Sequence, residues 1–134
     1  MPRIGGAKNR AGGRWTDARF NSFIKSLLRA GSKRWAPISD TLKEARTRRG
    51  FYRCNGCGEE VPATLKVGAR RIKNAVVDHV DPIIDPNEGF VSWDQTIERM
   101  FCEKEGLQVL CHACHEVKTK QERDIATERR RNNK

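Results

Sequence analysis

The sequence predicts an α+β fold in which a basic helical arm precedes a small mixed domain, and three observations support this. Apolar residues in 20–28 recur at the 3.6-residue spacing of one helix face. The runs 75–80 and 107–110 have the composition of short strands, and a charged segment with helical character follows the second. Two Cys-x-x-Cys pairs flank these runs, so a bound metal ion can staple a small core.

The first 49 residues predict a flexible arm followed by two helices. Residues 1–14 are rich in glycine and arginine and lack periodicity, so we expect a flexible basic arm. Thr16 is a suitable N-cap for the first helix, and Gly31 is a natural end for it. Pro37 in a first turn favours a second helix over 37–46. We expect residues 15–49 to form a helical hairpin with a basic outer face.

Residues 50–134 predict a single domain built around the cysteine pairs. The first pair lies in a knuckle over 51–60, followed by a strand over 63–67 and a basic turn at 70–73. A strand over 75–80 ends before Pro82, because proline cannot donate to a sheet ladder. Ser92 can cap a short helix, and the strand over 107–110 leads into a charged helix from about 113 to 129.

The net charge of +10 is placed unevenly along the chain. Residues 1–53 contain 14 Lys or Arg against 3 Asp or Glu, whereas residues 54–134 contain 13 against 14. A basic segment joined to a neutral one is typical of a nucleic-acid-binding arm, with a merely solvated basic surface as the alternative. There is no apolar run of 18 residues and no apolar signal core at the N-terminus, so we expect a cytoplasmic location without membrane contact.

Four of the five cysteines predict a structural zinc site. In a reducing compartment, two Cys-x-x-Cys pairs favour one tetrahedral zinc ion with four thiolates over disulfides. The expected ligands are Cys54, Cys57, Cys111 and Cys114. Cys102 has no partner pair and is expected to be a small, partly buried residue. A redox dithiol and a c-type haem site also match single pairs, but neither explains both pairs together.

A second group of residues has the composition of a catalytic metal site. Asp78 and His79 end a predicted strand, and His115 directly follows the fourth cysteine at the start of a helix. Zinc would tie that helix to the strands, so His115 should be held near the strand end. His112 lies between two cysteines, but four thiolates already complete a tetrahedral zinc shell.

These residues resemble the HNH endonuclease family, whose core is the ββα-metal or His-Me finger fold. The resemblance covers about residues 51–123 and lies in Val77-Asp78-His79-Val80-Asp81-Pro82, in Leu107-Gln108-Val109-Leu110-Cys111-His112-Ala113-Cys114-His115 and in Lys118-Thr119. The two predicted N-terminal helices, with Gly13-Arg14-Trp15-Thr16 and the Phe/Ile/Leu face of the first, resemble more weakly the front part of small phage-encoded HNH proteins. The resemblance therefore implies an HNH nuclease domain over residues 50–134 with a structural zinc ion.

The resemblance also implies the roles of the site residues. His79 would be the general base that deprotonates water, since imidazole changes protonation near neutral pH. Asp78 and His115 would hold one catalytic divalent ion, Mg²⁺ or Mn²⁺, with Ni²⁺ as a further option. The reaction would be hydrolysis of a DNA phosphodiester bond, as a nick. The chain departs from the family at Gly106, where an asparagine normally orients the base, so we expect a looser site or slower turnover.

DNA is the expected partner, and its backbone contacts are expected from basic residues of the arm, the basic turn and the last helix. These residues are Arg14, Arg19, Lys25, Arg29, Lys33, Arg34, Arg70, Arg71 and Lys118. The alternatives are a zinc-stabilised DNA-binding module without cleavage and an accessory protein of a phage packaging ATPase (terminase). We expect a monomer or a weak dimer.

Overall fold

The computed structural model describes residues 6–133, and the described chain divides into two compact units, 6–33 and 34–133. The division falls between Lys33 and Arg34, whereas the sequence predicted a boundary near residue 50. The fold is a mixed α+β arrangement with small antiparallel sheets, as predicted. Of the predicted flexible arm, residues 1–5 lie outside the described part of the chain.

The first unit is a turn followed by helix α1 (Asp17–Ser32). Thr16 is the N-cap, as predicted, and its hydroxyl accepts a hydrogen bond of 3.2 Å from the Arg19 amide. The ring of Trp15 packs edge-on against Phe23 with a centroid distance of 5.1 Å. The prediction that Gly31 ends the helix is wrong, because Gly31 keeps a helical backbone and Lys33 forms the C-cap.

The second unit begins with helix α2 (Ala36–Ala45), which packs against the central strands β6 (Ala75–His79) and β7 (Leu107–Cys111). The indole Nε1 of Trp35 donates a 2.7 Å hydrogen bond to the Cys102 carbonyl, and its ring meets Phe101 at 5.6 Å. The predicted helical hairpin over 15–49 is therefore divided between the two units. An apolar helix face favours packing against another element, but it does not show which element that is.

Two small sheets lie between α2 and the central strands in the sequence. Strands β1 (Arg46–Arg48), β2 (Phe51–Arg53) and β3 (Glu60–Pro62) form an antiparallel sheet in that order. Strands β4 (Thr64–Val67) and β5 (Arg70–Lys73) form a hairpin. The second helix was expected to reach residue 46 and residues 70–73 to form a turn, but residues 46–48 and 70–73 are strands. Gly50 and Gly68, with positive φ of 80° and 62°, allow the chain to reverse between the paired strands.

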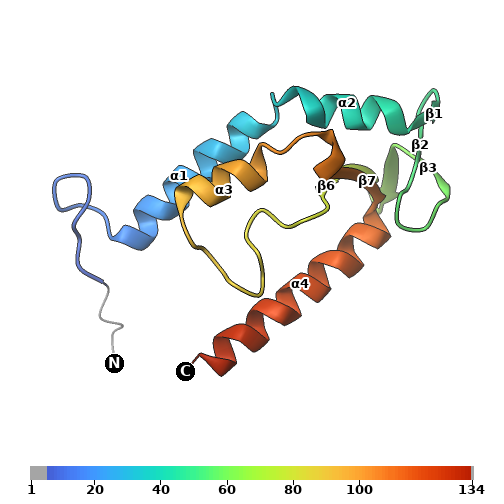
Figure 1. Ribbon diagram of the computed structural model, residues 1–134. Coiled ribbons are helices and arrows are strands. Elements are labelled where there is room, and N and C mark those ends of the chain that lie inside the picture. The colour runs from blue at the N-terminus through green and yellow to red at the C-terminus, as the bar shows by residue number, and fades with distance from the viewer. Residues whose placement is uncertain (1–5, 134) are drawn as a thin grey trace. The chain divides into compact units, whose positions relative to one another are not determined.

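Strands β6 and β7 form the antiparallel pair that positions the candidate site. Ala75 lies opposite Cys111, Asp78 opposite Gln108 and His79 opposite Leu107. Helix α4 (His112–Asn132) follows β7 directly, one residue earlier than predicted and three residues longer at its end. Figure 1 shows α2 on one side of this strand pair and α4 on the other, and both helices contact both strands. The pair is therefore covered on two faces.

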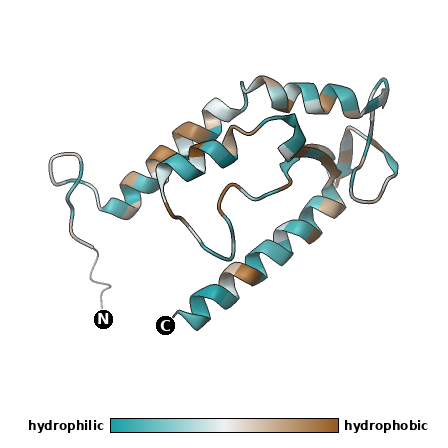
Figure 2. Ribbon diagram, in the orientation of Figure 1, coloured by the Kyte–Doolittle hydropathy of each residue, from teal (hydrophilic) through white to brown (hydrophobic). Residues whose placement is uncertain are grey.

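The connection from β6 to β7 contains helix α3 (Trp93–Met100) and the short 3₁₀ helix η1 (Lys104–Gly106). Ser92 caps α3 as predicted, with its hydroxyl accepting a 3.1 Å hydrogen bond from the Gln95 amide. Buried apolar side chains lie mainly on β7, at Cys54 and at Met100. Figure 2 shows that α4 is largely hydrophilic along its length. Within residues 6–133, no helix combines the length and the apolar character needed to cross a bilayer.

Candidate functional site

Four cysteine sulfurs converge at the junction of the first knuckle, β7 and α4. The Sγ atoms of the predicted ligands Cys54, Cys57, Cys111 and Cys114 all lie within 4.8 Å of one another. Four thiolates around one tetrahedral zinc ion at about 2.3 Å lie roughly 3.8 Å apart, so the cluster has the dimensions for one ion. The cluster can hold a metal ion such as zinc, as the sequence predicted.

The cysteine cluster distributes its protons unequally without a metal ion. Burial raises the pKa of the Cys54 thiol, but hydrogen bonds from the Cys57, Cys111 and Gly56 amides outweigh burial and lower it to about 6. The Cys111 amide lies 3.2 Å from the Cys54 sulfur. Hydrogen bonding to Cys111 and Cys54 raises the pKa of Cys114 to about 12. A bound divalent ion would remove this inequality between the thiols, because it stabilises all four thiolates at once.

Gly56 lies at a point of the knuckle where little room is left for a side chain. A Cβ at this position would lie 3.1 Å from both Cβ and Sγ of Cys114 and 3.2 Å from Leu110. The knuckle is also fixed to β7, since the Asn55 amide donates a 2.8 Å hydrogen bond to the Val109 carbonyl. The first Cys pair is thereby held directly against the strand and helix that carry the second pair.

Asp78 is the most enclosed carboxylate of the candidate catalytic site, with a side chain only 12% exposed. Its Oδ2 accepts hydrogen bonds from Lys118 Nζ at 3.1 Å and from Gln108 Nε2 at 3.1 Å. Its Oδ1 lies 3.7 Å from Nε2 of His115. The two oxygens therefore have different surroundings, with Oδ2 held by donors and Oδ1 turned toward the imidazole.

The pair of Asp78 and His115 has the dimensions of a two-ligand cation site. Carboxylate oxygen and imidazole nitrogen each bind a divalent ion at about 2.0–2.2 Å, which places two ligands of one ion roughly 3–4 Å apart. The observed 3.7 Å falls in that range. One carboxylate oxygen and one imidazole nitrogen are a better pair of ligands for Mn²⁺ than for Mg²⁺. These two predicted ligands are brought together by the structure.

Lys118 contributes positive charge to the same place. Its ammonium group lies 2.5 Å from Glu122 Oε1 and donates a 2.9 Å hydrogen bond to the His79 carbonyl. Burial lowers the pKa of Lys118, but hydrogen bonds with Glu122 and Asp78 outweigh burial and raise it above its usual value. Lys118 is therefore charged at neutral pH and partly neutralises Asp78.

The side chain of His79 lies at the end of β6 and has a fixed tautomer. Successive residues of a strand point to opposite faces, so the His79 ring leaves β6 on the face opposite to Asp78. Its Nε2 lies 2.8 Å from the Met100 carbonyl. A carbonyl only accepts hydrogen bonds, so Nε2 carries a proton, and in the neutral ring the lone pair is on Nδ1. This hydrogen bond thus joins the ring to Met100 rather than to Asp78 or His115.

Gly106 acts on the end of β6 through its backbone. Its carbonyl accepts a 2.9 Å hydrogen bond from the amide of Val80, the residue after His79. A Cβ at Gly106 would lie 3.0 Å from Cys102 Sγ and 3.3 Å from Cys102 Cβ. A side chain here would therefore displace Cys102, and the main chain already ties this turn to the strand end.

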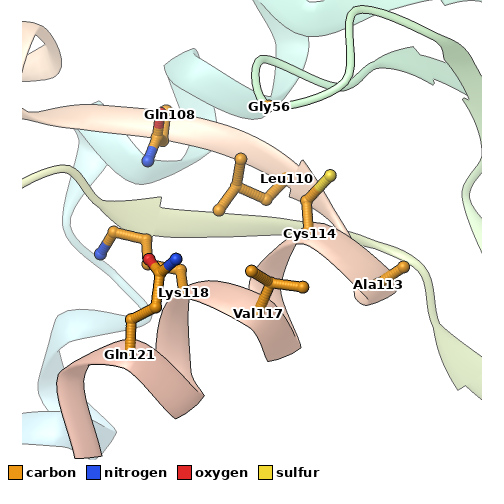
Figure 3. A pocket seen from close by; sticks show the side chains of 8 residues that line it. All are labelled: Gly56, Gln108, Leu110, Ala113, Cys114, Val117, Lys118 and Gln121. Atoms are coloured by element: carbon orange, nitrogen blue, oxygen red, sulfur yellow. The ribbon is translucent and has the colours of Figure 1, made fainter. Parts of the chain in front are cut away.

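A cavity of about 510 Å³ connects the cysteine cluster with the surroundings of Asp78. Figure 3 shows the Cys114 sulfur at one end of this cavity and the polar ends of Gln108 and Lys118 at the other. Leu110 and Val117 lie between them. The cavity thus has an apolar floor and a polar end beside the candidate cation site.

The predicted DNA contacts lie on separate elements. Arg19, Lys25 and Arg29 lie on α1, Lys33 caps that helix, and Arg14 belongs to the preceding turn. Arg34 begins the second unit, and Arg70 and Arg71 lie on β5. Lys118 instead lies in the candidate cation site. His112 is outside the cysteine cluster, with its Nε2 2.9 Å from Glu116.

Three contributors to the site were not predicted from the sequence: Asn55, the Met100 carbonyl and the ion pair of Lys118 with Asp78. Asn55 Nδ2 donates a 2.9 Å hydrogen bond to Gln108 Oε1. Gln108 lies opposite Asp78 because of the register between β6 and β7. From the sequence, this contact could have been found only by assuming that register.

The chain was compared with protein-family models, with curated proteins and with solved structures, and none of them matches it.

Proposed function

We propose that the chain is a metal-dependent DNA endonuclease of the HNH type, with a ββα-metal core formed by β6, β7 and α4. The observation that supports the proposal is the 3.7 Å approach of Asp78 Oδ1 and His115 Nε2, which come from a strand end and a helix start. The cysteine cluster supports it, because it joins α4, which carries His115, to β7, the strand that pairs with the Asp78 strand β6. The proposed reaction is hydrolysis of a phosphodiester bond, as a nick.

His79 is the proposed general base. With its Nε2 proton donated to Met100, the lone pair on Nδ1 is the group that can take a proton from water. The carbonyl fixes the ring plane, so the basic nitrogen keeps one direction. This arrangement provides the orientation that the family's asparagine supplies, and the Gly106 carbonyl fixes the next peptide.

Asp78 and His115 are the proposed ligands of a divalent ion, with Mn²⁺ or Mg²⁺ as the expected metal. When bound, such an ion stabilises the negative charge that grows on the phosphate and the leaving oxygen. Lys118 adds a charge next to that position, held by Asp78 and Glu122. Asp78 and Glu122 together outweigh the charge of Lys118, so this point would favour an anionic substrate once the divalent ion is bound.

The basic residues outside the site are the proposed DNA contacts. On the β4–β5 hairpin, Lys66 and Arg71 are paired across the strands, and Lys73 lies on the same face, with all three exposed. Pairs that lie directly opposite share one face, so this hairpin presents a compact cationic surface. With the charge of residues 6–33, it favours binding to the phosphate backbone, which weakens steeply with salt.

A plasmid-nicking assay tests the proposal. Zinc-loaded wild-type protein should convert supercoiled plasmid to open circles in Mn²⁺ or Mg²⁺, and chelation of the divalent ion should stop it. His79→Ala should reduce the nicking rate by about 10²–10⁴, the usual contribution of a positioned base. Its zinc content and its affinity for DNA should equal those of the wild type.

Two results would contradict the proposal. Nicking by His79→Ala at the wild-type rate would remove His79 as the base. Tight DNA binding without nicking in any divalent metal would instead identify a zinc-stabilised binding module, including an accessory role in DNA packaging. His112→Ala is the matched control, because His112 is half-buried in the same unit and pairs with Glu116 outside the proposed site.

A further inference from the structure

We infer that Asn55 and Gln108 are positioning residues that orient Asp78 for cation binding, so that the zinc knuckle sets the geometry of the second metal site. The inference rests on the proposed function, since it concerns the ligand Asp78. The observation behind it is a chain of two hydrogen bonds. Asn55 Nδ2 donates to Gln108 Oε1 at 2.9 Å, and Gln108 Nε2 donates to Asp78 Oδ2 at 3.1 Å.

The direction of this chain follows from the chemistry of its last member. A carboxylate of Asp78 accepts hydrogen bonds only, so Gln108 must turn its NH₂ group toward it. The amide oxygen of Gln108 then faces away and needs a donor. Asn55 supplies that donor with its side-chain NH₂. Each group has one orientation that satisfies its neighbours, so the chain holds all three side chains in place.

The first member of the chain is itself fixed by the zinc knuckle. Asn55 lies directly between Cys54 and Gly56, and its backbone amide donates a 2.8 Å hydrogen bond to Val109 on β7. Its position is therefore set by the thiols and by the strand that also carries Gln108. Metal binding at the cysteines and carboxylate orientation at Asp78 are linked through two side chains.

The other end of the chain determines which oxygen meets the cation. Gln108 and Lys118 both bind Oδ2 of Asp78. The carboxylate is thereby rotated so that Oδ1 lies toward His115. Without Gln108, the carboxylate could turn further toward the Lys118 ammonium, and both oxygens would then be drawn to a competing cation. Mutation of a residue that holds a metal ligand in this way typically lowers the metal affinity by about 10–100-fold.

The test is Mn²⁺ binding to zinc-loaded protein, measured by calorimetry, together with the Mn²⁺ concentration that gives half-maximal nicking. Gln108→Leu removes the amide, and both midpoints should rise by about 10–100-fold. Asn55→Ala should shift both in the same direction by less. Since Asn55 acts through Gln108, adding Asn55→Ala to Gln108→Leu should change nothing further.

The control is Gln121→Leu, the same chemical change at another residue that lines the cavity. It should leave both Mn²⁺ midpoints at the wild-type values. Zinc content, thermal midpoint and DNA affinity should be equal in all variants, so a purely structural effect would be recognised. Asn55 is exposed, so Asn55→Ala keeps the test informative if Gln108→Leu folds poorly.

Two outcomes overturn the inference, and they are distinguishable. Wild-type Mn²⁺ midpoints in both Gln108→Leu and Asn55→Ala would overturn the positioning role while leaving the nuclease proposal intact. A wild-type protein that binds no Mn²⁺ through Asp78, as judged by an Asp78→Asn variant, would overturn both.

Discussion

Single residues decide the candidate site through contacts that their types alone do not reveal. Asp78, His79 and His115 have the residue types of a metal-dependent hydrolytic site, but their usefulness depends on neighbours such as Gln108 and the Met100 carbonyl. Gly106 is a further residue whose type alone does not reveal its contact. Its lack of a side chain looks like a loss in the sequence, yet its carbonyl bonds the residue after His79.

Gly106→Ala should destabilise the protein by about 1–3 kcal/mol, the usual cost of forcing an extra methyl into a packed position. The new Cβ would lie 3.0 Å from Cys102 Sγ, so the cysteine side chain must move. Urea denaturation at saturating zinc measures the change in the free energy of unfolding.

The matched background for this substitution is Cys102→Ala, which removes the sulfur that causes the contact. In that background Gly106→Ala should cost clearly less, because only the 3.3 Å contact with Cys102 Cβ remains. Equal costs in both backgrounds would show that crowding by Cys102 is not the reason for glycine at this position.

At the scale of elements, Trp35 anchors α2 to the segment that follows α3. Trp35→Phe keeps the aromatic contact with Phe101 but removes the indole N–H that donates to the Cys102 carbonyl. We expect a loss of about 1 kcal/mol in the free energy of unfolding, the net value of one hydrogen bond with its carbonyl left unpaired. Equilibrium denaturation with zinc present measures it.

Trp93→Phe provides the comparison, because the Trp93 ring packs against Phe90 at the start of α3 in the same unit. A loss for Trp93→Phe as large as that for Trp35→Phe would assign the effect to ring size instead of the hydrogen bond.

Elements with strong local signals could be predicted from the sequence, and elements set by pairing could not. Thr16 and Ser92 marked two helix starts because their hydroxyls cap the first turn locally. The strands β6 and β7 were also recognisable from local signals, which are the β-branched run in β6 and the apolar run in β7. Strands β1, β2 and β3 have three residues each, too few to show a period, and they exist through their partners.

The candidate site was predictable to the same extent. The spacing of the cysteines implied one metal cluster, and the cluster implied that His115 lies near Asp78, where the structure places it. The chain from Asn55 through Gln108 to Asp78 was not predictable, because it depends on strand register and on the packing of the knuckle on β7. The placement of α2 was missed because an apolar stripe does not identify its partner.

For the molecule as a whole, the cysteine cluster is the expected source of stability of the second unit. Its buried apolar core is small, and structural zinc in small domains contributes about 10–16 kcal/mol of apparent binding free energy. Removing zinc with a strong chelator should therefore abolish the cooperative thermal transition of this unit, followed by circular dichroism. Restored zinc should bring the transition back, while Mg²⁺ should not, since thiolates select soft metals.

The variant that checks the assignment is Cys114→Ser, which removes one sulfur of the cluster. It should lower zinc affinity and the thermal midpoint in zinc, whereas Cys102→Ser, outside the cluster, should change zinc affinity little. A metal-free protein that keeps its full thermal transition would show that the core is sufficient by itself.

The most direct test of the central claim is a Mn²⁺ titration of zinc-loaded protein followed by electron paramagnetic resonance. We expect one exchangeable Mn²⁺ per chain, with binding lost in Asp78→Asn and strongly weakened in His115→Ala, because these side chains are 3.7 Å apart and are the proposed ligands. Mn²⁺ binding that is unchanged in both variants, or absent in the wild type, would contradict it.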